Sequence, residues 1–289
     1  MSYNKTVWED RESEFPNRYK DQNDNVLQLT RDEGVVTNTG TFINAAVMNN
    51  IENAVEELSV GWQSATGTFT YTSADAPTFV MATSVNTTSF ISVGMKLKLT
   101  QGTTKYFIVT AQTSNSLTLY GGTDYTLTSA AITEVQYSPH KAPFGFPLNP
   151  DKWTVTLIDT DRRQQEDPSA DVWYNPDGIS ITVPIGLWNI SYKANTYARL
   201  PDGEAGFRTC SMTLSETNDG DTLTQFKTAG YTFQPSGSNS LQVGTSNILS
   251  LLSKTTLYLN VSTSRPYLSR LGIDGGWSAT VIKATTVYL

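Results

Sequence analysis

Residues 186–198 read GLWNISYKANTYA, and this stretch decides the fold of the C-terminal half of the chain. The bulky apolar residues Leu187, Ile190 and Tyr192 alternate with polar ones, which is the pattern of a strand that buries one face. We also expect Trp188 to lie in the core. The stretch therefore predicts a half-buried β-strand.

Further β-prone runs surround this stretch and are joined by turns rich in Gly, Pro, Asn and Asp. Roughly eight strands within residues 151–289 predict a C-terminal head that is a jelly roll or β-sandwich. The last strand is expected to end at the chain terminus and to tie it into a sheet. The predicted strands are Trp153–Asp159, Ile179–Val183, Gly186–Ala198, Thr209–Thr217, Gln225–Thr232, Ser246–Leu252, Thr255–Thr263 and Trp277–Leu289.

A smaller β module is predicted over residues 61–137. Lys96–Thr100 and Lys105–Thr110 are β-prone runs on either side of a turn that contains Gly102, which predicts a hairpin. Another strand is predicted at Ser116–Tyr120. Residues 138–150, SPHKAPFGFPLNP, are rich in proline and predict a boundary or stiff connector between the module and the head.

The clearest helical pattern runs from about Asn44 to Leu58, and we assign residues 44–60 to a short, coiled-coil-like helix. Asn44 is a suitable N-cap. Steps of three, four and three residues separate the members of an apolar seam, which are Met48, Ile51, Val55 and Leu58. A narrow stripe of this kind needs a partner, either copies of the same helix in a bundle or another part of the same chain, and the seam is too short to fix the oligomeric state by itself.

Residues 1–43 contain few apolar side chains and cannot form a core of their own. They predict either an extended arm that becomes ordered against something else or a disordered leader. The segment MSYNKTVWED lacks the apolar core of a signal peptide.

Composition excludes several classes of protein. The formal charge of −7 argues against a nucleic-acid surface. No run of apolar residues is long enough to span a membrane, so we expect no membrane insertion. Cys210 is the only cysteine and cannot form an internal disulfide, so we expect it to be buried. Abundant Thr, Ser, Asn, Gly and aromatic residues favour a mainly β chain. The single cysteine and the polar N-terminus predict a chain made in a reducing cytosol.

Three stretches together resemble a known family. They are GTFINAAVMNNIENAVEEL, VNTTSFISVGMKLKLTQGTTKYFIVTAQTSNSLTLYGGTDYTLTSAAIT and YSPHKAPFGFPLNPDKWTV. In this order they resemble a module and helix of tail, baseplate and receptor-binding proteins of phages that infect Gram-positive bacteria. The match covers roughly residues 38–155. The head resembles, in pattern only, the trimeric jelly roll of the C1q and tumour-necrosis-factor class, through GLWNISYKA, TTLYLNVST and SATVIKATTVYL.

The resemblance implies a homotrimeric, fibre-like structural protein of the phage virion, assembled in the host cytoplasm. The N-terminal arm, residues 1–43, would dock on other tail or baseplate proteins, and the head, residues 151–289, would attach the particle to host cell-wall saccharide. A connector or decoration fibre without a receptor site is the alternative, and a glycan-degrading tailspike is a second one.

No catalytic constellation is visible in the sequence, and we expect no enzyme activity, cofactor or metal. His140 is the only histidine and has no identifiable Ser or Cys partner. One His and one Cys cannot supply a zinc site. Two acidic clusters lack the spacing of a calcium loop and are interpreted as solvated turns. Their members are Asp159, Asp161, Glu166 and Asp167, and Glu216, Asp219 and Asp221.

Saccharide recognition commonly combines an exposed aromatic ring with charged or amide groups. The richest candidate is the segment 262–277, which we expect to be a Gly-rich loop between the last two strands. A second candidate pair lies at Trp173 and Tyr174, although Trp173 could equally belong to the core. Trimer contacts or ordinary packing are the alternative roles of the late segment. The candidates in that segment are Arg265, Tyr267, Arg270, Asp274 and Trp277.

Overall fold

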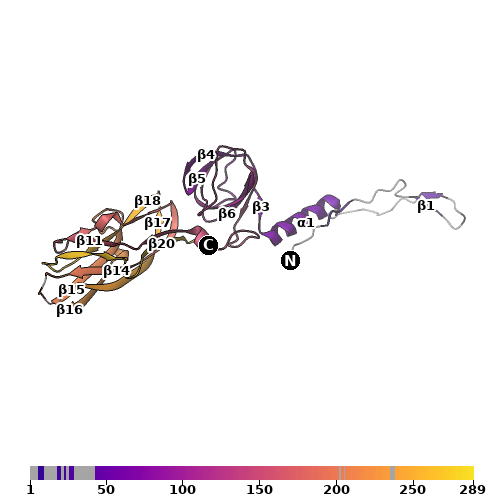
Figure 1. Ribbon diagram of the computed structural model, residues 1–289. Helices are drawn as coiled ribbons and strands as arrows, with labels where there is room; N and C mark the ends of the chain where they lie inside the picture. The colour runs from indigo at the N-terminus through magenta and orange to yellow at the C-terminus, as the bar shows by residue number, and fades with distance from the viewer. Residues whose placement is uncertain are drawn as a thin grey trace, which may run out of the picture. The chain divides into compact units, whose positions relative to one another are not determined.

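A computed structural model describes residues 6–9, 18–20, 23, 26–28, 43–201, 203–204, 206–234 and 238–289. The described chain is mainly β with antiparallel sheets, so the predicted fold class is confirmed at this level. The chain divides into two compact units, Met1–Trp62 and Gln63–Leu289 (Figure 1).

The first unit contains helix α1 (Ala45–Val60). Its predicted N-cap is confirmed, because the side chain of Asn44 accepts a hydrogen bond of 3.0 Å from the backbone N–H of Val47. The helix ends at Gly61, which has a φ of 72° and donates its N–H to the carbonyl of Glu57 at 2.7 Å. A left-handed residue at this position favours glycine, so the sequence determines both ends of the helix.

Most of the predicted arm, residues 1–43, lies outside the described residues. Its described part contains a short antiparallel pair, β1 (Arg18–Lys20) with β2 (Val26–Gln28), where the sequence shows little regular pattern. Trp8 lies against α1: its N–H donates to the side-chain oxygen of Asn49 at 2.9 Å, and the Asn49 amide donates to its carbonyl at 3.0 Å. One side chain of the helix thus holds the backbone of the preceding segment.

The second unit begins with a seven-stranded sheet in the order β3-β9-β6-β7-β8-β5-β4. The predicted hairpin is confirmed, because β6 and β7 pair antiparallel across Gly102, which has a φ of 74°. The alternating residues Thr68–Thr72 predict a strand where β4 lies, whereas strands β3, β5 and β9 were not predicted. The strands are β3 (Gln63–Ser64), β4 (Phe69–Asp75), β5 (Thr78–Thr83), β6 (Lys96–Gln101), β7 (Thr103–Gln112), β8 (Ser116–Tyr120) and β9 (Thr133–Ser138).

This sheet curls around an apolar core (Figure 1). Alternate residues of β6 and β8 point inward, as the two-residue period requires. The core contains Phe69, Phe79, Met81, Ile91, Leu97, Leu99, Phe107, Val109, Leu117, Leu119, Leu127 and Val135.

Two further antiparallel sheets form the head. The first has the order β10-β20-β14-β19-β11, with β17 on the other side of β14. It consists of β10 (Thr154–Asp159), β11 (Arg162–Glu166), β14 (Gly186–Arg199), β17 (Ser238–Leu251), β19 (Arg270–Asp274) and β20 (Thr280–Thr286). The second has β18 at its centre and consists of β12 (Trp173–Tyr174), β13 (Ser180–Val183), β15 (Gly206–Ser215), β16 (Thr228–Gln234) and β18 (Thr255–Ser262).

The stretch 186–198 forms most of β14. Trp188, Ile190 and Tyr192 point into the core, and the predicted burial of Trp188 is confirmed. Leu187 is only partly buried, because neighbouring residues of a strand face opposite sides of the sheet. The Tyr192 hydroxyl donates to the carbonyl of Phe226 at 2.9 Å, and it also contacts Thr228 of the second sheet at 2.7 Å. The two sheets therefore pack as a β-sandwich.

Several predicted details of the head can be compared with the structure. Cys210 is buried, as expected. The last strand, β20, ends at Thr286 and is therefore shorter than predicted. The backbone nevertheless remains attached, since the N–H of Val287 donates to the carbonyl of Leu187 at 3.1 Å.

Residues 138–150 contain no strand beyond Ser138, but they are not a bare linker. Phe146 is buried and stacks on Trp153, with ring centroids 5.0 Å apart. Tyr120 of β8 meets Trp188 of β14 edge-to-face at 5.0 Å. Aromatic pairs at such distances are favourable. The rings of Tyr120, Phe146, Trp153 and Trp188 therefore form a buried aromatic cluster, the joint, between the module, the proline-rich segment and the head.

Candidate functional site

The segment 262–277 is not a single loop, and that expectation is wrong. Strand β19 (Arg270–Asp274) lies in its middle, paired with β11 on one side and β14 on the other. Leu271 and Ile273 are buried, whereas Gly272 lies where a Cβ atom would come within 1.9 Å of the carbonyl oxygen of Arg163. Glycine at this position allows β11 to approach closely, and the same glycine makes the sequence look like a loop.

Before β19, the loop that carries Tyr267 runs beside the loop that follows β11. The N–H of Asp171 donates to Thr263 at 2.7 Å, and the N–H of Asp167 donates to Ser269 at 3.0 Å. Leu268 is buried and anchors the loop, while the Tyr267 side chain is 81% exposed. Its φ of 71° is rare for a bulky residue, so the structure holds this ring outward at a local backbone cost.

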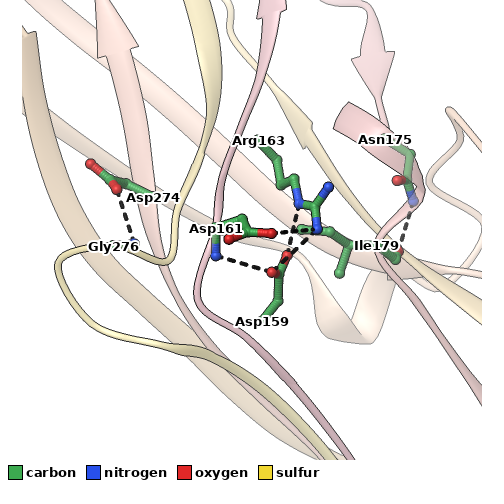
Figure 2. Close-up of polar contacts among 7 residues, drawn as sticks. All are labelled: Asp159, Asp161, Arg163, Asn175, Ile179, Asp274 and Gly276. Carbon is green, nitrogen blue, oxygen red and sulfur yellow. Dashed lines mark hydrogen bonds and ion pairs between the residues drawn. The ribbon is translucent and has the colours of Figure 1, made fainter.

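After β19, a second turn presents Trp277, which is 80% exposed. Asp274 opens this turn and accepts the N–H of Gly276 at 3.2 Å, as Figure 2 shows. The N–H of Gly275 donates to the carbonyl of Asp161 at 2.9 Å. The two residues directly before Trp277 are therefore anchored by hydrogen bonds, and the exposed ring follows this anchored part of the turn.

Asp274 itself does not offer its carboxylate to solvent. It is 2% exposed and receives a hydrogen bond of 2.7 Å from Nη2 of Arg162. This contact is the main cause that raises the pKa of Arg162 above its ordinary value. Asp274 therefore acts in orienting Arg162, which the sequence interpretation missed.

Arg270 lies on the same outer face, and its Nε donates to Glu166 at 3.0 Å. That hydrogen bond raises the pKa of Arg270, and the hydroxyl of Tyr197 contributes in the same direction. Tyr197 is buried, with the Arg162 guanidinium 4.7 Å from its ring centroid. Tyr197 and Arg162 were not predicted. The two-residue spacing of Arg162, Gln164 and Glu166 could have indicated a shared strand face.

The remaining predicted residues lie apart from this face. The N–H of Arg265 donates to Oγ1 of Thr263 at 3.1 Å, and its guanidinium lies against the backbone of Gly206. Trp173 and Tyr174 form β12 in the other sheet, and both are partly buried. The Tyr174 hydroxyl accepts the N–H of Ser169 at 3.0 Å. The structure therefore places the seven predicted residues on β19, on β12 of the other sheet and in the loops that flank β19.

The acidic cluster around Asp159 is engaged with an arginine (Figure 2). Nε of Arg163 donates to Asp159 at 3.1 Å, and its Nη2 donates to Asp161 at the same distance. The hydrogen bond to Asp159 is the main cause that raises the pKa of Arg163. Asn175, also drawn there, donates its amide to the carbonyl of Ile179 at 2.9 Å. These contacts make the cluster part of the framework that holds the turns.

In the first unit, the helix seam faces solvent. Ile51 is 52% and Leu58 73% exposed, and Val55 is also exposed, while Met48 is partly buried. Asn49, which holds Trp8, lies on a different face of the helix from this seam. No helix in the described part of the chain is long and apolar enough to cross a membrane.

Comparison with known proteins gives no family. No protein-family model matches the chain, and no curated protein gives a significant match. Among solved structures, latent PorU from Porphyromonas gingivalis is 12% identical with a TM-score of 0.29, over 76% of this chain and 24% of that one. A chain in the structure of the Gx strain of infectious bursal disease virus is 11% identical with a TM-score of 0.27, over 78% of this chain and 60% of that one.

The tandem CBM22 modules of Paenibacillus barcinonensis Xyn10C are 13% identical with a TM-score of 0.21, over 78% of this chain and 94% of that one. The chain spans about a quarter of the length of PorU, of which it covers 24%. Similarities at these scores carry no argument about function.

Proposed function

We propose that this chain is a non-enzymatic structural protein of a phage tail or baseplate that attaches the virion to host cell-wall saccharide. The observation that carries the proposal is the pair of exposed rings, Tyr267 and Trp277, each held on an anchored turn beside β19. Exposed rings that flank a strand carrying Arg270, which is paired with Glu166, are suited to stacking on a sugar and binding its hydroxyls.

The proposed assembly is a homotrimer with a jelly-roll head of the C1q and tumour-necrosis-factor kind. The exposed seam at Ile51, Val55 and Leu58 supports it, because coiled-coil packing against two further copies would remove these side chains from water. The arm, residues 1–43, would bind other tail or baseplate proteins. Three heads per trimer would convert weak single-site affinity into firm attachment.

Light scattering of the full-length chain tests the assembly. The expected mass is about three times the 31.7 kDa of one chain. Replacement of both Ile51→Asp and Leu58→Asp places carboxylates in the seam and should return the mass to that of a single chain. The matched replacement Glu56→Asp changes the helix surface outside the seam and should leave the mass unchanged. A single-chain mass for the unaltered protein would refute the trimer.

Binding to a panel of purified cell walls from Gram-positive bacteria tests the attachment. We expect specific, saturable binding to a subset of the panel, and no release of oligosaccharide on incubation. A connector or decoration fibre should bind none of the walls. Release of oligosaccharide would instead establish a glycan-degrading tailspike.

A further inference from the structure

Three arginines converge where β11, β19 and the end of β14 meet, and we call this group the arginine corner. It consists of Arg162, Arg199 and Arg270, with the ring of Tyr197 beneath. In the strand register, Arg199 stands directly opposite Arg270. Arg270 stands opposite Glu166 on its other side, and Arg162 stands opposite Asp274. Directly opposite residues of antiparallel strands project from the same face, so these side chains share the outer face of the sheet.

Arg199 and Arg270 bring two like charges directly opposite each other, an arrangement that is unfavourable by itself, and the ion pair of Arg270 with Glu166 offsets part of it. The arginines also interact over a longer range, since the charge of Arg270 acts to lower the pKa of Arg162. This concentration is unusual in a chain of net charge −7 that has no arginine between Arg31 and Arg162.

Two of the guanidinium groups are held in place by neighbours that leave donors available. Arg162 is fixed by Asp274 through Nη2 and by the Tyr197 ring, and Arg270 is fixed by Glu166 through Nε. A guanidinium carries five N–H donors in a planar fork, so both retain donors beyond these contacts. Their side chains are about half and about one-third exposed, respectively. Such preorganisation lowers the entropy lost when a ligand binds.

We propose that the arginine corner binds an anionic group, a phosphate or a carboxylate, through the forks of Arg270 and Arg162 and the charge of Arg199. Arginine is suited to this because its fork matches both anions bidentately. The inference rests on the proposed saccharide-binding function and specifies it. The bound glycan is an acidic one, whose charged group lies in the corner while a sugar ring stacks on Tyr267, three residues before Arg270.

The test uses the full-length chain and two probes that contain no sugar, inorganic phosphate and acetate. Each is titrated at constant ionic strength against chloride, while the arginine side-chain N–H resonances are followed by NMR. We expect saturable shifts of the Arg162 and Arg270 signals with at least one probe. Saturation by phosphate alone identifies a phosphate-bearing ligand, and saturation by acetate as well extends the ligand class to carboxylated glycans.

Variants separate a built site from general attraction. Arg199→Gln should weaken binding about tenfold, and Arg270→Lys should weaken it similarly although the charge is kept, because a lysine cannot offer the fork. Lys283→Gln removes one exposed positive charge from the same outer face at β20 and should leave binding unchanged.

Shifts that do not saturate would overturn the inference, as would equal losses in Lys283→Gln and Arg199→Gln. The proposed function and this inference fail separately. If the protein binds cell walls but neither phosphate nor acetate shifts the arginine signals, the ligand is a neutral glycan and the anion site is refuted. If phosphate binds but no cell wall does, attachment is refuted and the anion site is retained.

Discussion

In the module formed by β3 to β9, the rings of Phe79, Phe107 and Tyr120 are buried in the core or the joint, whereas the head leaves Tyr267 and Trp277 almost fully exposed. The two regions share the same strand chemistry and differ in where their aromatic area goes. In the module that area stabilises the fold. In the head, part of that area faces solvent, and this difference is what supports the proposal that the head performs recognition.

Truncation of a buried ring should have the largest effect on stability. Trp188→Ala removes a fully buried indole that also contacts Tyr120, and it should lower the free energy of unfolding by about 3–5 kcal/mol. Urea denaturation of the full-length chain measures this. Tyr267→Ala is the matched exposed control and should change stability by less than about 0.5 kcal/mol. Equal costs for the two variants would remove the distinction between the regions.

The partners of charged groups also differ between the regions. Arg162→Ala should lower the free energy of unfolding by about 1–3 kcal/mol, because the buried Asp274 carboxylate loses its charged partner. The same replacement in an Asp274→Asn background should cost less, since no buried charge remains. A double-mutant cycle measures the difference. A coupling energy of zero would mean that Asp274 does not orient Arg162.

In the module, the buried cation Lys96 donates to the carbonyls of Gly94 and Tyr288, not to a carboxylate. Burial lowers its pKa from 10.5 to about 8, and the charge of Lys141 acts in the same direction. The unfolded chain therefore binds more protons between these pH values. It follows that the Lys96 contribution to the free energy of unfolding rises as pH increases across this range.

Denaturation from pH 8 to about 9.5 tests this effect, because that range ends below the region where the tyrosines titrate. The unaltered chain should gain stability relative to Lys96→Met as pH rises. Tyr120 and Tyr192 make the upper limit necessary, since burial raises both of their pKa values. A difference between the two proteins that is constant with pH would contradict the lowered pKa.

The sequence predicted the parts of the fold where local pattern and tertiary packing agree. Asn44 and the apolar steps that follow it give a helix start that needs no tertiary information, and Trp188 lies on a strand with a strong period. The β6 and β7 hairpin could be predicted because Gly102 marks its turn. Short or weakly apolar strands could not be predicted in this way. Strand β11 has the sequence RRQQE, which contains no apolar residue. It forms a strand because it pairs with β19 at the edge of the sheet.

The candidate site was predicted in composition but not in arrangement. Tyr267, Arg270 and Trp277 do cluster around one strand, yet Gly272 hid that strand because its role is a close approach between backbones. The partners Arg162 and Tyr197 come from other strands, far away in sequence. Only the register brings them to the site, and a single sequence does not contain the register.

A small effect on stability combined with a large effect on binding would support the comparison most directly. Trp277→Ala should leave the free energy of unfolding within about 0.5 kcal/mol of the unaltered chain, because the ring is exposed on a turn held by backbone hydrogen bonds. Denaturation and circular dichroism provide the measurement. A loss of several kcal/mol would show that Trp277 is a packing residue and not part of a free surface.

The most direct test is a titration of the full-length chain, unaltered and with Tyr267→Ala and Trp277→Ala combined, against the cell-wall polysaccharide that it binds best. We expect saturable binding by the unaltered chain and a loss of at least about tenfold in affinity for the double variant at unchanged stability. Equal affinity of the two proteins would contradict the claim that these exposed rings form the attachment surface.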